Sequence, residues 1–253
     1  MGQNPILAGG VESRISIYQS TPNEEHPAGT RGFLPDGRVF YWCRNESGSS
    51  LAAGKLHMAA SVVAVHVNHA ALAGSGGIGQ QFVTFTMNGT TGFTVNQYKD
   101  GYLYINAGTG LGQTFKIRDH LAYAINATGV IVNLFDPLVV ALDVTSKLSF
   151  RKNIYDNPQA VGSLVGPAAG VPAVALATAT RGWLQTWGPC AVLSDVSAPT
   201  TGSVIIQSVA TAGAIAIAVG GAGATVVTTP HVGAAFDAGV SAEYRMIDLR
   251  IRQ

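Results

Sequence analysis

Charged residues are scarce in this chain. They make up 11% of the 253 residues, against about 25% in an average soluble domain. The 15 Lys and Arg residues nearly balance the 14 Asp and Glu residues, and the basic residues form no cluster, which disfavours nucleic-acid binding because that binding draws on clustered positive charge. A surface with few charges loses little hydration when it is covered, so the composition favours extensive contact with other proteins.

Cysteine and export signals are scarce as well. Cys43 and Cys190 lie far apart with no metal-ligand spacing around them, so we expect two buried small apolar side chains, with a disulfide as the alternative. The first ten residues lack the charged and apolar parts of a signal peptide, and we therefore expect cytoplasmic synthesis. Residues 196–236 contain no charged residue, but their glycines make a poor membrane span, so no membrane partner is expected.

Motifs for cofactor binding or catalysis are weak. Residues 74–79 match G-x-G-x-x-G, but the stretch after them has the pattern of a strand, whereas a dinucleotide site needs a helix there. His66 and His69 would point to opposite faces of a strand, which does not favour a metal site. The aspartates are scattered among turn positions. We expect no enzyme activity, no metal and no cofactor, although a glycosidase pair of carboxylates stays open as an alternative.

Short runs of alternating or β-branched residues between turn signals predict an all-β fold of sandwich or barrel-like modules built from short antiparallel strands, with little helix. The turn at 35–37 leads into an aromatic strand at 38–44. A meander follows in the middle of the chain. We expect its strands, and the others that show this pattern, at residues 61–67, 81–87, 93–98, 102–106, 114–118, 129–134, 139–142, 147–150, 183–186, 190–193, 204–209, 214–219 and 244–251.

Changes in residue composition along the sequence divide the chain into three predicted parts. Residues 1–28 end in a polar, turn-rich stretch that contains two prolines, and they show no helical periodicity. This pattern predicts an extended N-terminal arm. Residues 29–165 form a β-rich module that contains the meander. Gly and Pro residues at 165–172 mark a boundary, and residues 166–253 form a C-terminal β module.

Two stretches are candidate interfaces. The arm carries Ile15, Ile17 and Tyr18 in an alternating run. In the C-terminal module, residues 214–219 alternate alanine with larger side chains, so that one face would present Ile215, Ile217 and Val219 and the other would permit close approach. A strand that is apolar on both faces is either sandwiched or placed at an interface.

Five segments resemble the head decoration, or capsid cement, proteins of tailed bacteriophages. The resemblance implies a β-rich virion protein on the capsid surface, with the major capsid protein and copies of itself as partners, often as a homotrimer, and with no catalytic residue to carry over. The chain is larger than many cement proteins, which leaves open whether its middle region faces a receptor. The segments that carry the resemblance are residues 29–41, 51–56, 186–192, 232–239 and 243–249.

The sequence therefore predicts a structural, capsid-stabilising protein that acts through protein contacts and is not an enzyme. The alternative is a phage fibre or host-glycan-binding adhesin module, in which Trp42 or Trp183 would stack on sugars. We favour the structural role because aromatic strands are more often core than binding sites.

Overall fold

The structure is a computed structural model. It describes residues 3–46, 48–72, 74–160, 166–195, 199–218, 230–238, 240 and 242–253. Across these residues it contains strands, turns and bridges and no helix, and the strands pair antiparallel. The predicted all-β fold class is confirmed. In the same part of the chain, no helix of a length and apolarity able to cross a membrane is found.

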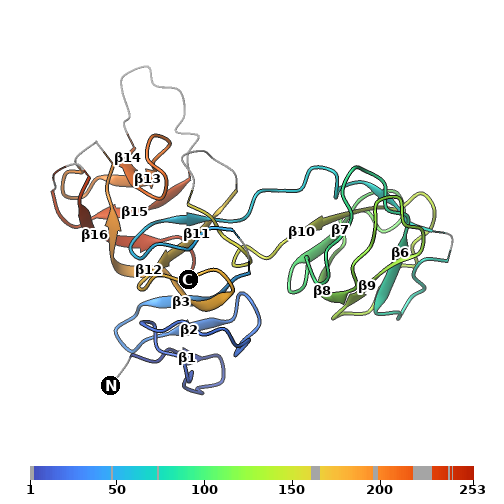
Figure 1. Ribbon diagram of the computed structural model, residues 1–253, viewed down its shortest axis with the longest axis horizontal. Coiled ribbons are helices and arrows are strands. Elements are labelled where there is room, and N and C mark those ends of the chain that lie inside the picture. The colour runs from blue at the N-terminus through green and yellow to red at the C-terminus, as the bar shows by residue number, and fades with distance from the viewer. Residues whose placement is uncertain are drawn as a thin grey trace. The chain divides into compact units, whose positions relative to one another are not determined.

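The chain folds into two compact units, of which one is inserted into the other. Met1–Ser61 and Ile154–Gln253 form the split unit, and Val62–Asn153 forms the inserted unit (Figure 1). This division differs from the predicted boundaries after residues 28 and 165. Strand pairing accounts for the difference, because β3 from the first segment and β12 from the last are neighbours in one sheet, a long-range pairing that composition does not reveal.

The split unit is built on one ten-stranded sheet with the order β1-β2-β3-β12-β16-β15-β13-β14, while β11 pairs with β12 and β4. The inner strands are long and the outer ones short. The bounds are β1 (Ile6–Leu7), β2 (Arg31–Phe33), β3 (Val39–Asn45), β4 (His57–Met58), β11 (Ala168–Pro172), β12 (Thr180–Leu193), β13 (Val204–Gln207), β14 (Ile215–Ile217), β15 (His231–Ala235) and β16 (Tyr244–Arg250).

β12 is the central strand of this sheet. Its first half pairs with β3 and its second half with β16, with a register shift between Gln185 and Trp187 where the partner changes. The two strands predicted at 183–186 and 190–193 are therefore parts of one strand. The first half is covered on both faces, because Trp183 packs in one apolar cluster and Leu184 in another. This double burial explains the continuous apolar and aromatic sequence of β3 and β12.

The N-terminal segment belongs to the fold of the split unit and is not an extended arm. Ile17 is completely buried beside Trp42 and Trp183. The indole Nε1 of Trp183 donates a hydrogen bond to the carbonyl oxygen of Ile15, at 2.9 Å, and Thr21 pairs through its backbone with Arg181. The polar, proline-rich sequence of this segment suppresses secondary structure, but its apolar residues still pack.

The inserted unit is a six-stranded antiparallel sheet with the order β5-β10-β7-β8-β9-β6. A bridge between Ala71, next to β5, and Phe85 in β6 brings the two edges together, so that the sheet is nearly closed and barrel-like. Its interior is filled by aliphatic and aromatic side chains from every long strand. The bounds are β5 (His69–Ala70), β6 (Phe82–Phe85), β7 (Tyr102–Ala107), β8 (Thr114–His120), β9 (Val130–Leu134) and β10 (Lys147–Arg151).

Three strands predicted in this region are wrong. Residues 61–67 form a loop and turns, residues 93–98 make one bridge at Phe93 and then form turns, and residues 139–142 make only one bridge. Asn68 and Asn96 adopt the left-handed conformation, with φ of 61° and 55°, and so interrupt the extended backbone. Their apolar neighbours are buried by loop packing, which the alternation pattern cannot distinguish from a strand.

Glycines set the turn that joins β7 to β8. Gly108 has φ of +77°, and a Cβ there would overlap the carbonyl oxygen of Thr145. Gly112 has φ of +85°, but a Cβ there would meet open space. An alanine at position 112 would therefore introduce backbone strain alone, whereas an alanine at position 108 would introduce both backbone strain and steric overlap.

We expect Gly108→Ala to destabilise the inserted unit by about 2–5 kcal/mol, because it adds overlap with the backbone to the left-handed strain. The matched control Gly112→Ala should cost only about 1–2 kcal/mol, from strain alone. Hydrogen exchange of residues 102–120, measured against urea, reports both free energies. Equal losses of free energy of unfolding in the two variants would contradict the expectation that steric overlap adds to the cost of Gly108→Ala.

Candidate functional site

The structure separates the six predicted interface residues. Ile17 and Ile215 are completely buried, so neither can meet a partner while the chain is folded. Ile15 and Ile217 are partly buried, and Val219 lies outside the described residues. Tyr18 is 54% exposed. The predicted surface is therefore corrected to Tyr18, because the other described members contribute to the core of the split unit or lie at its margin.

A groove in the split unit does fit a protein partner. It lies on the solvent-facing side of the β12–β16 pair, has a volume of about 450 Å³, and reaches Tyr18. Strand alternation creates it: Val192, Ile247 and Leu249 point into the core, which leaves their neighbours facing outward. The outward-facing side chains that line it are Pro189, Ala191, Tyr244 and Met246.

The groove is apolar, exposed and rigidly framed. Tyr244 is 52% exposed and Met246 is 42% exposed. The ring of Tyr244 packs so closely on Gly54 that a Cβ at that position would overlap it. Among the described residues, Arg38 is the only charged residue that lines the groove, and it is paired with Asp36. Large apolar side chains held at a surface by packing are typical of protein-binding sites, where ordering on binding costs little.

The cysteines do not give the groove covalent chemistry. Burial raises the pKa of the Cys190 thiol, which lies at the floor of the groove, to about 12, and it raises the pKa of the buried Cys43 as well. Both are free, which confirms the expectation of two buried small side chains. A thiol with a raised pKa is a poor nucleophile at neutral pH.

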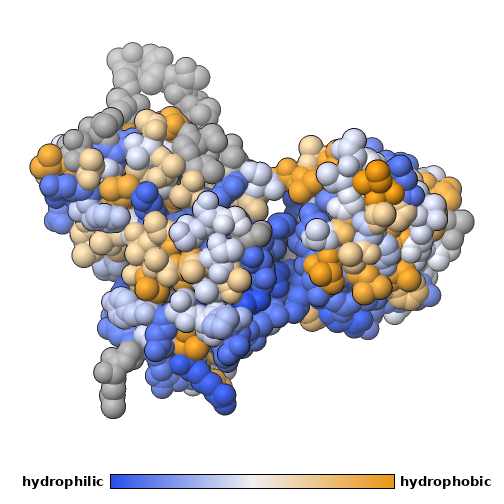
Figure 2. Space-filling model, in the orientation of Figure 1, coloured by the Kyte–Doolittle hydropathy of each residue, from blue (hydrophilic) through white to orange (hydrophobic). Residues whose placement is uncertain are grey.

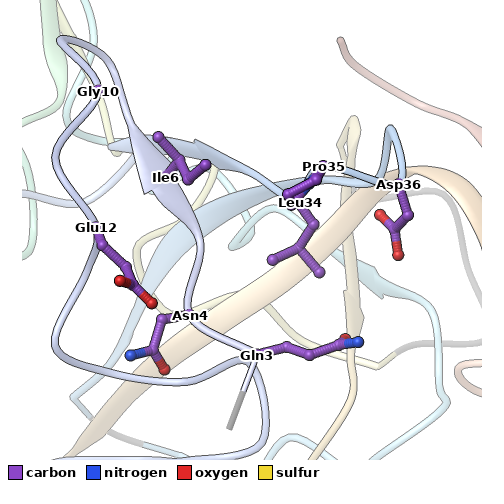
Figure 3. Close-up of a pocket in the computed structure, with 8 residues that line it drawn as sticks. All are labelled: Gln3, Asn4, Ile6, Gly10, Glu12, Leu34, Pro35 and Asp36. Carbon is purple, nitrogen blue, oxygen red and sulfur yellow. The ribbon is translucent and has the colours of Figure 1, made fainter. Parts of the chain in front are cut away.

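A second hollow of about 600 Å³ lies between the N-terminal segment and the β2–β3 turn. Glu12 and Asn4 point toward one another on one side of it, and Leu34 and Pro35 close the other (Figure 3). Asp36 at its edge is already paired with Arg38 at 2.8 Å. The mixture of one partnered and one free carboxylate around an open, shallow hollow does not resemble a catalytic pair.

Three histidines meet inside the inserted unit. The rings of His66 and His69 lie 6.4 Å apart, centroid to centroid, so the prediction that they point to opposite faces is wrong, because residue 66 is in a turn and not in a strand. His66 bonds through Nδ1 to the Tyr98 hydroxyl at 2.5 Å. The ring of His120 accepts a hydrogen bond from the backbone N–H of Tyr98. Burial lowers the pKa of all three histidines.

This histidine cluster is a structural feature of the core and lacks carboxylate ligands. Among the described residues, no group of three or more His, Cys, Asp or Glu side chains is placed to hold a metal ion. Two aspartates elsewhere are engaged in the fold: Asp156 pairs with Arg44 at 3.2 Å, and Asp143 accepts a hydrogen bond from Thr109.

The tryptophans that might have stacked on a sugar are core residues. Trp42 is completely buried and Trp183 is 1% exposed. Their rings pack against each other at 5.0 Å with an interplanar angle of 72°. Neither is available to a ligand, so a glycan site built on them is excluded.

The sequence contained a signal for the groove that pattern reading missed. In residues 189–192 and 244–247, positions that face the core alternate with apolar positions that face solvent, and an alternating pattern alone does not reveal that the solvent-facing positions of two strands meet in one groove. Surface apolar residues are visible on both units (Figure 2). Comparisons with known proteins add no family: no protein-family model matches the chain, and neither a curated protein nor a solved structure matches it.

Proposed function

We propose that this chain is a structural virion protein that decorates a capsid, binds its outer shell and stabilises the head through protein contacts. The observation that carries the proposal is the exposed apolar groove over β12 and β16, framed by Tyr18, Tyr244 and Met246. A scarcity of charge accompanies it, since 11% of the residues are charged. Both features fit a surface that is covered by another protein in its working state.

The mechanism is stabilisation by linkage. A protein that binds the assembled shell and not its separated subunits lowers the free energy of the assembled state. A standard interface buries about 800 Å² on each partner, and many copies repeat this contribution over a shell. In this role the partners are the major capsid protein and further copies of the chain, with a homotrimer as the expected oligomer and the capsid surface as the location.

Sedimentation with purified phage heads tests the proposal. We expect the wild-type protein to sediment with the heads and Met246→Asp to bind at least about tenfold more weakly, because a carboxylate in the covered groove would lose its hydration. Ile131→Asp is the matched control, since Ile131 is 43% exposed and Met246 is 42% exposed. If the wild-type protein stays in the supernatant, or if both variants bind as the wild type does, the proposal fails.

A host-glycan-binding adhesin is the second candidate, favoured by one observation. Tyr18 and Tyr244 present exposed aromatic rings at the same groove, and such rings can pack on sugars. Binding on a glycan array that Tyr244→Ala removes, together with failure to sediment with heads, would select this function over decoration.

A further inference from the structure

A short run of turns in the inserted unit, residues 94–99, is fastened to the end of β8 through His120. The backbone N–H of Asn96 donates a hydrogen bond to the carbonyl oxygen of His120 at 3.0 Å. The Asn96 side chain accepts one from the His120 backbone N–H, also at 3.0 Å. The backbone N–H of Tyr98 donates to Nε2 of the His120 ring at 3.1 Å. We call residues 94–99 the Tyr98 segment.

The Tyr98 segment also has hydrogen bonds of its own. The backbone N–H of Gln97 donates to the carbonyl oxygen of Thr94 at 3.2 Å, and that of Lys99 donates to Asn96 at 3.0 Å. The Gln97 side chain accepts a hydrogen bond from the Thr94 N–H at 3.0 Å. The segment can therefore separate from β8 and keep its turns, which is the behaviour of a unit that opens locally.

The two nitrogens of the His120 ring have fixed roles. Nδ1 lies 2.8 Å from the carbonyl oxygen of Leu121, which can only accept, so Nδ1 carries the proton. Nε2 meets the backbone N–H of Tyr98, which can only donate, so Nε2 is the unprotonated acceptor of a neutral imidazole. Because both partners are backbone groups, neither can reverse its role, and the hydrogen bonds are complete only for the neutral ring.

His66 bonds to the same segment in a more adaptable way. Its Nε2 lies 3.1 Å from the carbonyl oxygen of Thr91 and carries the proton, so Nδ1 accepts from the Tyr98 hydroxyl at 2.5 Å. A hydroxyl can rotate and accept, so a protonated His66 keeps a partner at Tyr98. His66 and His120 are therefore opposite tautomers, and of these two rings only His120 would present a donor to a donor when protonated.

The charged groups next to His120 do not remove the preference for a neutral ring. Burial is the main cause that lowers the pKa of His120; the bond to Leu121 and the charge of Asp119 raise it, and His66 lowers it further. Asp119 is itself paired with Arg118 at 3.1 Å. Burial therefore outweighs the one carboxylate that favours the protonated form.

The groups on the Tyr98 side do not supply a compensating negative charge either. Burial raises the pKa of the Tyr98 hydroxyl, although Arg151 of β10 lowers it, so the hydroxyl stays neutral in acid. Lys99 and Asp100 follow Tyr98 in the chain, and Asp100 is buried. The third histidine of the cluster, His69 of β5, has its own partner in the side chain of Asn88.

We propose that the Tyr98 segment is a pH switch: protonation of His120 at Nε2 places two donors against each other and releases the segment from β8. The step takes one proton from solvent and breaks hydrogen bonds only. The rings of Tyr98 and Phe93, which are 2% and 3% exposed in the closed form, are uncovered by the release. Acid would thus present new aromatic surface on the inserted unit while its sheet stays paired.

The tautomers of the two histidines give the first test, which needs no variant. We expect a long-range proton–nitrogen correlation spectrum of the full chain at pH 7.5 to show the proton of His120 on Nδ1 and that of His66 on Nε2. A proton on Nε2 of His120 would overturn the inference, because the backbone N–H of Tyr98 would then have no acceptor there.

Hydrogen exchange of the full chain at pH 7.5 and pH 5 tests the release itself. Protection factors, which correct for the intrinsic pH dependence of exchange, are compared between the segment and the neighbouring strands. We expect the amides of Asn96 and Tyr98, whose acceptors belong to His120, to lose more protection in acid than those of β7 and β10. An equal loss in the segment and the strands, or none in the segment, would overturn the inference.

His120→Gln separates the hydrogen bonds from the titration. Glutamine offers a donor and an acceptor but takes up no proton, so the segment of this variant should keep at pH 5 the protection that it has at pH 7.5. His69→Gln is the matched control: it removes another buried, titrating ring of the same unit, and its segment should still open in acid. Circular dichroism at pH 7.5 verifies that both variants are folded.

A His120→Gln segment that opens in acid as the wild type does would contradict the switch, and so would a His69→Gln segment that no longer opens. If glutamine does not hold the segment at pH 7.5, the tautomers and the exchange of the wild-type protein decide the question.

Discussion

Lowering the pH from 7.5 to 5 is expected to destabilise the inserted unit. The cause is the buried cluster of His66, His69 and His120, each of which is at most 3% exposed. Burial lowers the pKa of each histidine from its ordinary value of 6.5, and Asp119 only partly offsets this at His120 by raising its pKa. In the folded state the three rings therefore take up protons at a lower pH than they do in the unfolded chain.

The sign of the effect follows from proton binding. Below pH 6.5 the unfolded chain binds protons that the folded chain refuses, so the free energy of unfolding falls as the pH falls. Each histidine whose pKa is lower in the folded state than in the unfolded chain contributes to this loss, and the three act in the same direction. Above pH 6.5 the protonation of these histidines should no longer change the free energy of unfolding of the unit.

The split unit also contains histidines whose pKa is lowered by burial. It contains His57, a single completely buried histidine whose pKa is lowered by burial to about 4, and His26, whose pKa is lowered by burial although Glu25 raises it. These two groups also make the free energy of unfolding of the split unit fall as the pH falls.

The unfolding of the two units can be followed by different measurements. All three tryptophans lie in the split unit, so tryptophan fluorescence follows that unit, and hydrogen exchange of residues 62–153 follows the other. His120→Gln should reduce the dependence of the inserted unit's free energy of unfolding on pH. An inserted unit equally protected at pH 7.5 and pH 5 would contradict the role of the cluster.

Trp183→Ala is expected to destabilise the split unit by about 3–5 kcal/mol, the range for removal of a buried aromatic side chain. The indole fills space between Trp42 and the N-terminal segment, so its removal leaves a cavity. It also removes the indole hydrogen bond to the carbonyl oxygen of Ile15, to which the Ser13 hydroxyl still donates at 3.2 Å. We expect the backbone amide of Ile17, which bonds to Gln3, to exchange faster as the segment detaches.

Urea unfolding followed by far-ultraviolet circular dichroism measures this loss. Trp183→Phe keeps most of the apolar volume and removes the hydrogen bond, so it should cost less than the alanine variant. The difference between the free energies of unfolding of the two variants measures the cost of the cavity. A loss below about 1 kcal/mol for Trp183→Ala would show that the N-terminal segment is not anchored through the indole.

The sequence predicts strands where local alternation and turn chemistry agree. The Pro35-Asp36-Gly37 turn is formed, with the backbone of Leu34 bonded to Arg38 and Gly37 at φ of +88°, and β3 follows it as predicted. β8, β9, β10 and β16 also occupy the predicted stretches. These elements share a short-range cause, because a tight turn and a two-residue period are both set by neighbouring residues.

The division into units and the groove depend on long-range pairing. Nothing near residue 61 indicates that the chain will return at residue 154 to complete the same sheet. The groove requires β12 and β16 to be neighbours, and they are separated by more than 50 residues of sequence. The N-terminal segment was mispredicted for the same reason: Ile17 is buried by Trp42 and Trp183, which no local pattern connects to it.

The insertion of one unit into the other has a consequence for how such a chain can be altered. On the split-unit side of the junction, Ser61 accepts a hydrogen bond from Gln159 at 2.7 Å, and Met58 pairs with Gln159 through the backbone, so the outgoing and returning strands of the chain are neighbours. Residues 62–153 can therefore be exchanged as a cassette, since a replacement needs only two ends that lie close together. Different inserted units could then be carried by the same split unit without redesign of the sheet that supports them.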